Sequence, residues 1–168
     1  MAAPEPVDEV DRLVAAWRRE RPDLDVGPLE VLSRVSRLAR HLDRARRTAF
    51  ETHALEPWEF DVLAALRRAG DPYQLSPGAL ITQTLVTSGT MTNRIDRLET
   101  RTLVERLKDP DDRRGVLVRL TPEGRTRVDA ALADLLEHER DILGSLSAHE
   151  RADLGSLLRR LTLPFDNA

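Results

Sequence analysis

The sequence has 168 residues, of which 33% are charged, 40% hydrophobic and 4% aromatic, and its net charge is −3. It has no cysteine, and its four scattered histidines lack the spacing of a metal site, which argues against disulfides, thiol catalysis and metal binding. No apolar run approaches the roughly 18 residues of a membrane span, and the acidic N-terminus does not resemble a secretory signal. We therefore expect a cytoplasmic helical protein with no cofactor and no membrane partner.

Two amphipathic helices are predicted at the N-terminus. Apolar residues recur at three- and four-residue steps between Pro6 and Glu20, and the segment RPDLDVGP then breaks the helix. A longer helix is predicted from about Pro28 to Thr52, with an apolar seam near heptad spacing. The other side of this helix carries arginines: Arg34, Arg37, Arg40, Arg44 and Arg47.

Three shorter helices are predicted next. Pro57 begins a helix that ends at Gly70, and Ser76-Pro77 combines a helix cap with a first-turn proline. That second helix closes near Thr84, and the turn TLVTSG leads to a third helix, capped by Thr87 or Ser88. The arrangement predicts a helix-turn-helix.

A hairpin and two more helices complete the chain. The runs 103–108 and 115–120 alternate apolar and polar residues, and DPDDRR between them is a turn. Thr121-Pro122 begins a helix that reaches Leu143, and Ser147 begins a last one that ends near Leu161.

This order of elements predicts a mainly α winged helix-turn-helix fold with a small β wing. We expect N-terminal helices over 1–52, a DNA-binding lobe over 53–121 and C-terminal helices over 122–168. The long flanking helices have more apolar surface than one small lobe covers, which favours a dimer built from the N- and C-terminal helices. The alternative is a single-chain helical bundle, which gives no reason for the arginines at the hairpin tip.

The segment VTSGTMTNRIDRLE is the predicted recognition helix. At 100° per residue, Met91, Ile95 and Leu98 form one apolar stripe, and polar residues of a size suited to base edges surround it. The candidate DNA contacts are Ser88, Thr90, Thr92, Asn93 and Arg97. The alternative interpretation is an ordinary solvated helix face.

The hairpin tip carries Arg113 and Arg114, and an extended arginine suits the electronegative minor groove. We expect Asp112 to pair with Arg114 and to hold its pose. Otherwise the tip is a solvated turn whose ion pairs contribute about 0–1 kcal/mol each.

The runs SGTMTNRIDRLE, LVERL and DPDDRRGVLVRLTPEG resemble the MarR family of bacterial transcription regulators over nearly the whole chain. The resemblance implies a homodimer on a pseudo-palindromic operator, with recognition helices in successive major grooves and Arg114 in the minor groove. It also implies a repressor that releases double-stranded DNA when a small anionic or phenolic ligand binds.

One position departs from the family pattern. The family commonly has glycine before the first wing strand, where this chain has Thr102. If that turn is left-handed, a β-branched residue there costs roughly 1–3 kcal/mol.

The chain further resembles the urate-responsive members of the family, which have an extra first helix with a tryptophan. The resemblance implies a ligand pocket of Trp17, Asp61, Arg94 and Arg106. Arg94 lies about 60° from the centre of the apolar stripe and needs a counter-charge, which Asp61 could supply until a planar anion replaces it. Alternatively, Trp17 is a core anchor, Asp61 and Arg94 form a structural ion pair, and Arg106 contacts phosphate.

The sequence gives no support for an enzyme, because it has no phosphate-binding glycine loop and no paired nucleophile and base. Two functions remain: a regulator that responds to an anionic ligand, urate or a related purine among the candidates, and a ligand-independent DNA-binding dimer of the same fold.

Overall fold

The computed structural model describes residues 6–112 and 114–166, and the chain divides into two units, Met1–Arg44 and Ala45–Ala168. The predicted boundaries at residues 52 and 121 both fall inside the second unit. In the described part of the chain, no helix combines the length and the apolar character needed to cross a membrane.

The first unit is a helical hairpin of α1 (Glu9–Glu20) and the first part of α2 (Gly27–Glu51). Val10 and Val14 of α1 are buried in a small apolar cluster with Val26. Leu13 and Trp17 were predicted on the same apolar seam, but they stay 38% and 48% exposed. Only one stripe of α1 is therefore buried within this unit.

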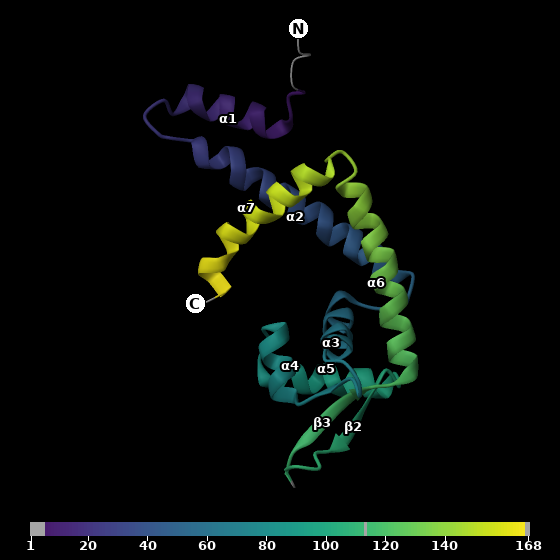
Figure 1. The fold of residues 1–168 in the computed structure, drawn as a ribbon. Coiled ribbons are helices and arrows are strands. Elements are labelled where there is room, and N and C mark those ends of the chain that lie inside the picture. Colours follow the sequence, from purple (N-terminus) through teal and green to yellow (C-terminus); the bar gives the residue numbers. More distant parts are fainter. Residues whose placement is uncertain (1–5, 113, 167–168) are drawn as a thin grey trace. The chain divides into compact units, whose positions relative to one another are not determined.

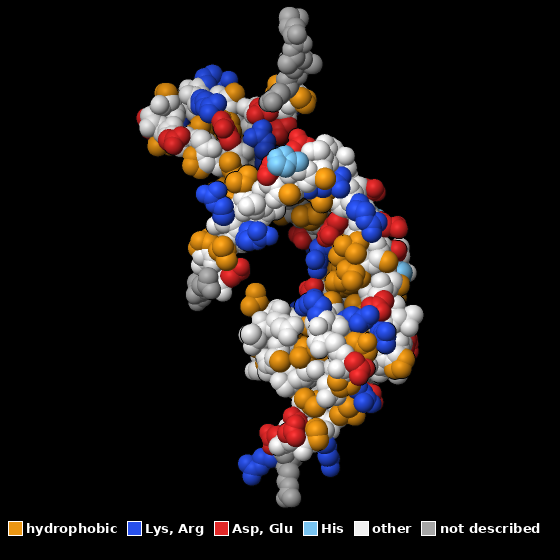
Figure 2. All heavy atoms as spheres, in the orientation of Figure 1, with side chains coloured by type: hydrophobic (Ala, Val, Ile, Leu, Met, Phe, Trp, Pro, Cys, Tyr) orange, Lys and Arg blue, Asp and Glu red, His pale blue; other side chains and the backbone are white. Residues whose placement is uncertain are grey.

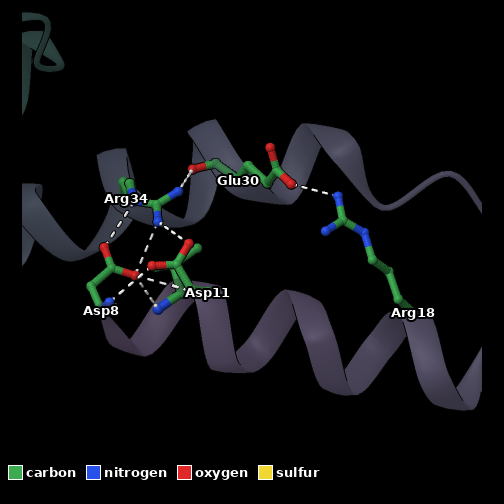
Figure 3. A network of polar contacts seen from close by, with 6 residues as sticks. Asp8, Asp11, Arg18, Glu30 and Arg34 are labelled. Carbon is green, nitrogen blue, oxygen red and sulfur yellow. Dashed lines mark hydrogen bonds and ion pairs between the residues drawn. The ribbon is translucent and has the colours of Figure 1, made fainter. Parts of the chain in front are cut away.

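An ionic cluster joins the two helices of the first unit (Figure 3). The Arg34 guanidinium on α2 donates to both carboxylate oxygens of Asp8, at 2.9 and 3.0 Å, and to Asp11 at 2.7 Å. Asp8 also caps α1, because its carboxylate accepts the backbone N–H groups of Val10 and Asp11, and α1 therefore begins at Glu9. The Asp11 N–H and the Arg34 guanidinium together lower the pKa of Asp8 to about 2. Arg34, predicted on a solvated face, thus binds α1.

The second unit contains a helical lobe of α3 (Pro57–Arg68), α4 (Pro77–Thr84), α5 (Ser88–Thr100) and α6 (Pro122–Ile142) (Figure 1). The side chains of Ser76, Thr87 and Thr121 accept backbone N–H groups at the starts of α4, α5 and α6, which confirms the predicted caps. The predicted apolar stripe of α5 is also confirmed. The stripe is buried in one core together with apolar residues of α3 and α4. This core contains Met91, Ile95 and Leu98 of α5, Val62, Leu63 and Leu66 of α3, and Leu80 of α4.

A three-stranded antiparallel sheet of β1 (Gln74–Leu75), β2 (Val104–Lys108) and β3 (Val116–Leu120) lies beside these helices, in the order β1-β3-β2. Strand β1 is too short to show an alternating pattern and was not predicted. Strands β2 and β3 form the predicted hairpin, with Val104 opposite Leu120 and Lys108 opposite Val116. The mainly α fold with a small β wing is therefore confirmed.

A close backbone contact ties the hairpin to α6. A Cβ atom at Gly124 would collide with the carbonyl oxygen of Leu103, so this position requires glycine. The last helix, α7 (Ala148–Asp166), continues past the predicted end at Leu161 and through Pro164, and it has no buried residue.

Candidate nucleic-acid interface

The polar face of α5 is open to solvent. All five candidate DNA contacts are exposed: Ser88, Thr90, Thr92, Asn93 and Arg97. The Thr92 hydroxyl donates to the Ser88 carbonyl oxygen at 3.1 Å, and the Thr90 hydroxyl lies 2.9 Å from that of Thr87. The hydroxyls of the two threonines thus have local partners, whereas Asn93 has no side-chain partner within residues 6–112 and 114–166. Such a surface can reach into a groove and contact base edges.

The hairpin tip mixes basic and acidic side chains (Figure 2). Arg114 is exposed, and its backbone N–H donates to the Asp112 carboxylate at 2.9 Å. The predicted side-chain pair between Asp112 and Arg114 is therefore replaced by a turn in which Asp112 binds the backbone. Among residues 6–112 and 114–166, no carboxylate pairs with the Arg114 guanidinium, which can therefore bind a ligand. Arg113 lies outside the described residues.

Two arginines of α5 stack on Trp58, at the N-terminal end of α3. The guanidinium carbons of Arg97 and Arg94 lie 4.7 and 5.5 Å from the centre of the indole ring. Glu56 accepts a hydrogen bond from Arg97 at 3.1 Å and another from the Trp58 Nε1–H at 2.5 Å. The indole, both arginines and Gly89, Thr90 and Asn93 line a hollow of about 400 Å³.

Arg106 on β2 binds α5 on the side opposite to this hollow. Its guanidinium forms ion pairs with Asp96 and Glu99, and its backbone N–H donates to Glu99 at 3.2 Å. Desolvation lowers the pKa of Arg106, but the hydrogen bonds that its guanidinium donates to Asp96 and Glu99 outweigh this effect and raise the pKa above its usual value. Arg106 therefore fixes the first wing strand, β2, to α5.

The three expected pocket residues of the second unit, Asp61, Arg94 and Arg106, have other partners and do not pair with one another. Asp61 forms its ion pair with Arg46, at 2.9 Å, and not with Arg94. Arg46 is favoured as the partner because its guanidinium also lies over the Phe50 and Phe60 rings beside Asp61. Trp17 belongs to the first unit and the other three residues to the second, so a shared pocket stays a prediction.

Thr102 adopts the left-handed backbone conformation, with φ of +58°. The turn before the first wing strand therefore has the conformation that favours glycine, as the sequence comparison with the family indicated. The Thr102 hydroxyl donates to Glu123 at 3.0 Å, and Thr121 donates to the Thr102 carbonyl oxygen at 2.7 Å.

Several residues of this interface were not found by sequence reasoning. Glu56 and Arg46 carried no periodic or motif signal, because their roles depend on which helices meet. Glu59 is 1% exposed, and its carboxylate binds Arg101 from the end of α5 at 2.5 Å.

In the described ranges, no group of three or more His, Asp or Glu side chains is arranged to hold a metal ion.

Comparisons with known proteins match the chain to transcription regulators of the MarR family. A family model described as "MarR family" matches residues 55–115. The chain is 40% identical to the HTH-type transcriptional regulator PecS of Dickeya dadantii over 91% of this chain and 92% of that protein. PecS is named as a transcriptional regulator and the relative NicR of Pseudomonas putida as a transcriptional repressor, in agreement with the expectation that the chain is not an enzyme.

Solved structures add two functional contexts. A point mutant of MarR from E. coli, in complex with operator DNA, is 28% identical with a TM-score of 0.68 over 82% of this chain and 99% of that one. BpsR of Bordetella bronchiseptica is 31% identical with a TM-score of 0.59 over 77% and 98%. Its structure concerns regulation of DNA binding by 6-hydroxynicotinic acid.

Proposed function

Because the chain belongs to the MarR family of DNA-binding transcription regulators, we propose that it is a homodimeric repressor that a small planar anion releases from its operator. The observation that carries this proposal is the exposed polar face of α5, which is fixed to the wing by Arg106 and flanked by the exposed Arg114. In this proposal, Ser88, Thr90, Thr92, Asn93 and Arg97 contact the major groove.

The homodimer is supported by apolar surface on the terminal helices. Large apolar side chains are at least 38% exposed on each of them: Leu13 and Trp17 on α1, Val31, Leu32, Val35 and Leu38 on α2, and Leu157, Leu161 and Phe165 on α7. Helix α7 has no buried residue within one chain, and burial of apolar surface is the main driving force of association. A second copy offers the same surface, as a two-fold interface requires.

The effector is proposed to be a planar anion such as urate or a related purine. Arg94 is half-buried and forms no ion pair among the described residues, so a ligand could take its guanidinium without first displacing a carboxylate. Arg106 would transmit the change, since it holds β2 and α5 together. The likeness to BpsR supports an anionic aromatic ring as the ligand class.

Titration of the protein–DNA complex with candidate effectors tests the ligand response. The DNA is a duplex that the protein selects from a random-sequence pool, and the effectors are urate, xanthine, salicylate and trans-aconitate. We expect a planar purine anion to lower the affinity, because a ligand that favours the DNA-incompetent conformation shifts the population. Unchanged affinity with every effector would instead support the ligand-independent dimer.

The Arg94→Ala variant separates the two roles of α5. We expect this variant to keep most of its DNA affinity and to lose the response to the effector. Loss of DNA binding or of folding in this variant would show that Arg94 is a DNA-contacting or structural residue and not part of a ligand site.

A further inference from the structure

In the free protein, the carboxylate of Glu56 binds the guanidinium of Arg97. Arg97 is a proposed DNA contact, yet in this structure its guanidinium is bound by Glu56 at 3.1 Å and stacked on Trp58. Both side chains of the Glu56–Arg97 pair are more than half exposed, so solvent and a competing anion can reach the guanidinium. The pair is accordingly weak and exchangeable.

We propose that Glu56 and Trp58 are positioning residues with opposite effects on DNA binding. Glu56 competes with DNA for Arg97 and lowers the affinity of the free protein. Trp58 holds the Arg97 guanidinium at the edge of α5. There the guanidinium can exchange the Glu56 carboxylate for a DNA phosphate while it stays stacked on the indole ring. The inference rests on the proposed contact between α5 and DNA.

The geometry allows the Arg97 guanidinium to exchange Glu56 for a DNA phosphate within the hollow beside Trp58. Trp58 is half-buried, packs against the core of the lobe and donates its Nε1–H to Glu56, so the indole ring is held in place, whereas the Arg97 side chain is 53% exposed. The hollow beside the ring is lined by Gly89, where a Cβ atom would meet nothing within 4 Å, and by Arg94. A phosphate that enters this hollow can reach the Arg97 guanidinium, and the cation–π contact keeps that guanidinium near the ring without neutralising its charge.

The charge balance predicts how the DNA affinity depends on salt in the parent protein and in a variant that lacks the Glu56 charge. When Arg97 leaves Glu56 for a phosphate, Glu56 is left to take up a cation from solution. Removing the Glu56 charge abolishes this uptake, so the variant releases about one more ion on binding DNA and its log K falls more steeply with log salt.

The test compares DNA affinity and its salt dependence in matched variants. Glu56→Gln keeps an oxygen that can accept the Trp58 Nε1–H but removes the charge, and we expect about two- to fivefold tighter binding with a salt slope steeper by about one. Trp58→Leu removes the ring, and we expect about two- to fivefold weaker binding, while Trp58→Phe stays close to the parent. Glu9→Gln, which breaks an exposed pair with Arg12 on α1, controls for net charge alone.

A double-mutant cycle identifies the group through which Glu56 acts. In an Arg97→Gln background, Glu56→Gln is expected to have no effect on affinity, because the competition no longer exists. A purely structural role would weaken binding in both the Glu56 and the Trp58 variants. Equal or weaker binding by Glu56→Gln, or the same gain in the Arg97→Gln background, would overturn the inference. If the parent itself bound no selected duplex, the proposed function would fail instead.

Discussion

Arginine side chains organise the interface, and they differ in the groups that they contact. Arg97 and Arg94 stack on an indole, Arg106 pairs with two carboxylates of α5, and Arg101 binds the buried Glu59. The fifth, Arg114, projects from the hairpin tip. The interface is thus made of guanidiniums that differ in how easily an incoming anion can take them.

The backbone strain at Thr102 predicts a stabilising substitution. Thr102→Gly is expected to raise the free energy of unfolding by about 1 kcal/mol, because relief of the left-handed conformation outweighs the added chain entropy of glycine. Urea denaturation measures the change. Thr100→Gly is the control, because Thr100 lies in α5 and glycine there should destabilise. A lower urea midpoint for Thr102→Gly would contradict the strain argument.

The wing assignment predicts a loss of affinity on truncation. Arg114→Ala should weaken binding to the selected duplex and should flatten the salt dependence of log K by about one unit if a phosphate contact is lost. Arg19→Ala, which removes an exposed arginine from α1, is the matched control. Affinity equal to that of the parent at the same salt concentration would rule out the wing contact.

At the scale of elements, the sequence predicted most of the helices and the hairpin but few of the contacts between them. Caps such as Thr87 and Thr121 are local signals and were predictable, as was the buried stripe Met91, Ile95 and Leu98. The partners of Asp61 and Arg94 were not, because an ion pair depends on the distance between side chains of different helices. The close approach of Gly124 to Leu103 is likewise a property of the assembled lobe.

The ionic cluster between α1 and α2 predicts a pH dependence. Asp8 has a pKa of about 2 in the folded chain against an ordinary value of 3.8, so its contribution to the docking of α1 is fully present above about pH 4. That contribution is lost as the pH falls from 3.8 through 2, because only the ionised carboxylate binds Arg34. An NMR titration of the Asp8 carboxyl carbon measures the pKa directly, with Arg34→Gln as the comparison. An unshifted value in the parent chain would show that the cluster does not form in solution.

At the scale of the whole molecule, apolar side chains remain exposed on α1, α2 and α7, and the residues proposed to contact DNA are gathered on α5 and the hairpin. This distribution suggests separate surfaces for dimerisation and for DNA binding. In the proposed dimer, the terminal helices provide the surface for a second copy, and the lobe provides the polar surface for DNA. One lobe alone reads one half-site, so affinity for a pseudo-palindrome depends on two copies held together.

Hydroxyl-radical footprinting of the protein on its selected duplex tests the central claim most directly, namely that paired α5 helices contact DNA. We predict two protected patches related by two-fold symmetry, with their centres about 34–36 Å apart, one turn of the helix. A variant in which Asn93 is replaced by alanine should lose protection at both patches together. A single asymmetric patch, or protection that does not change in this variant, would contradict the account.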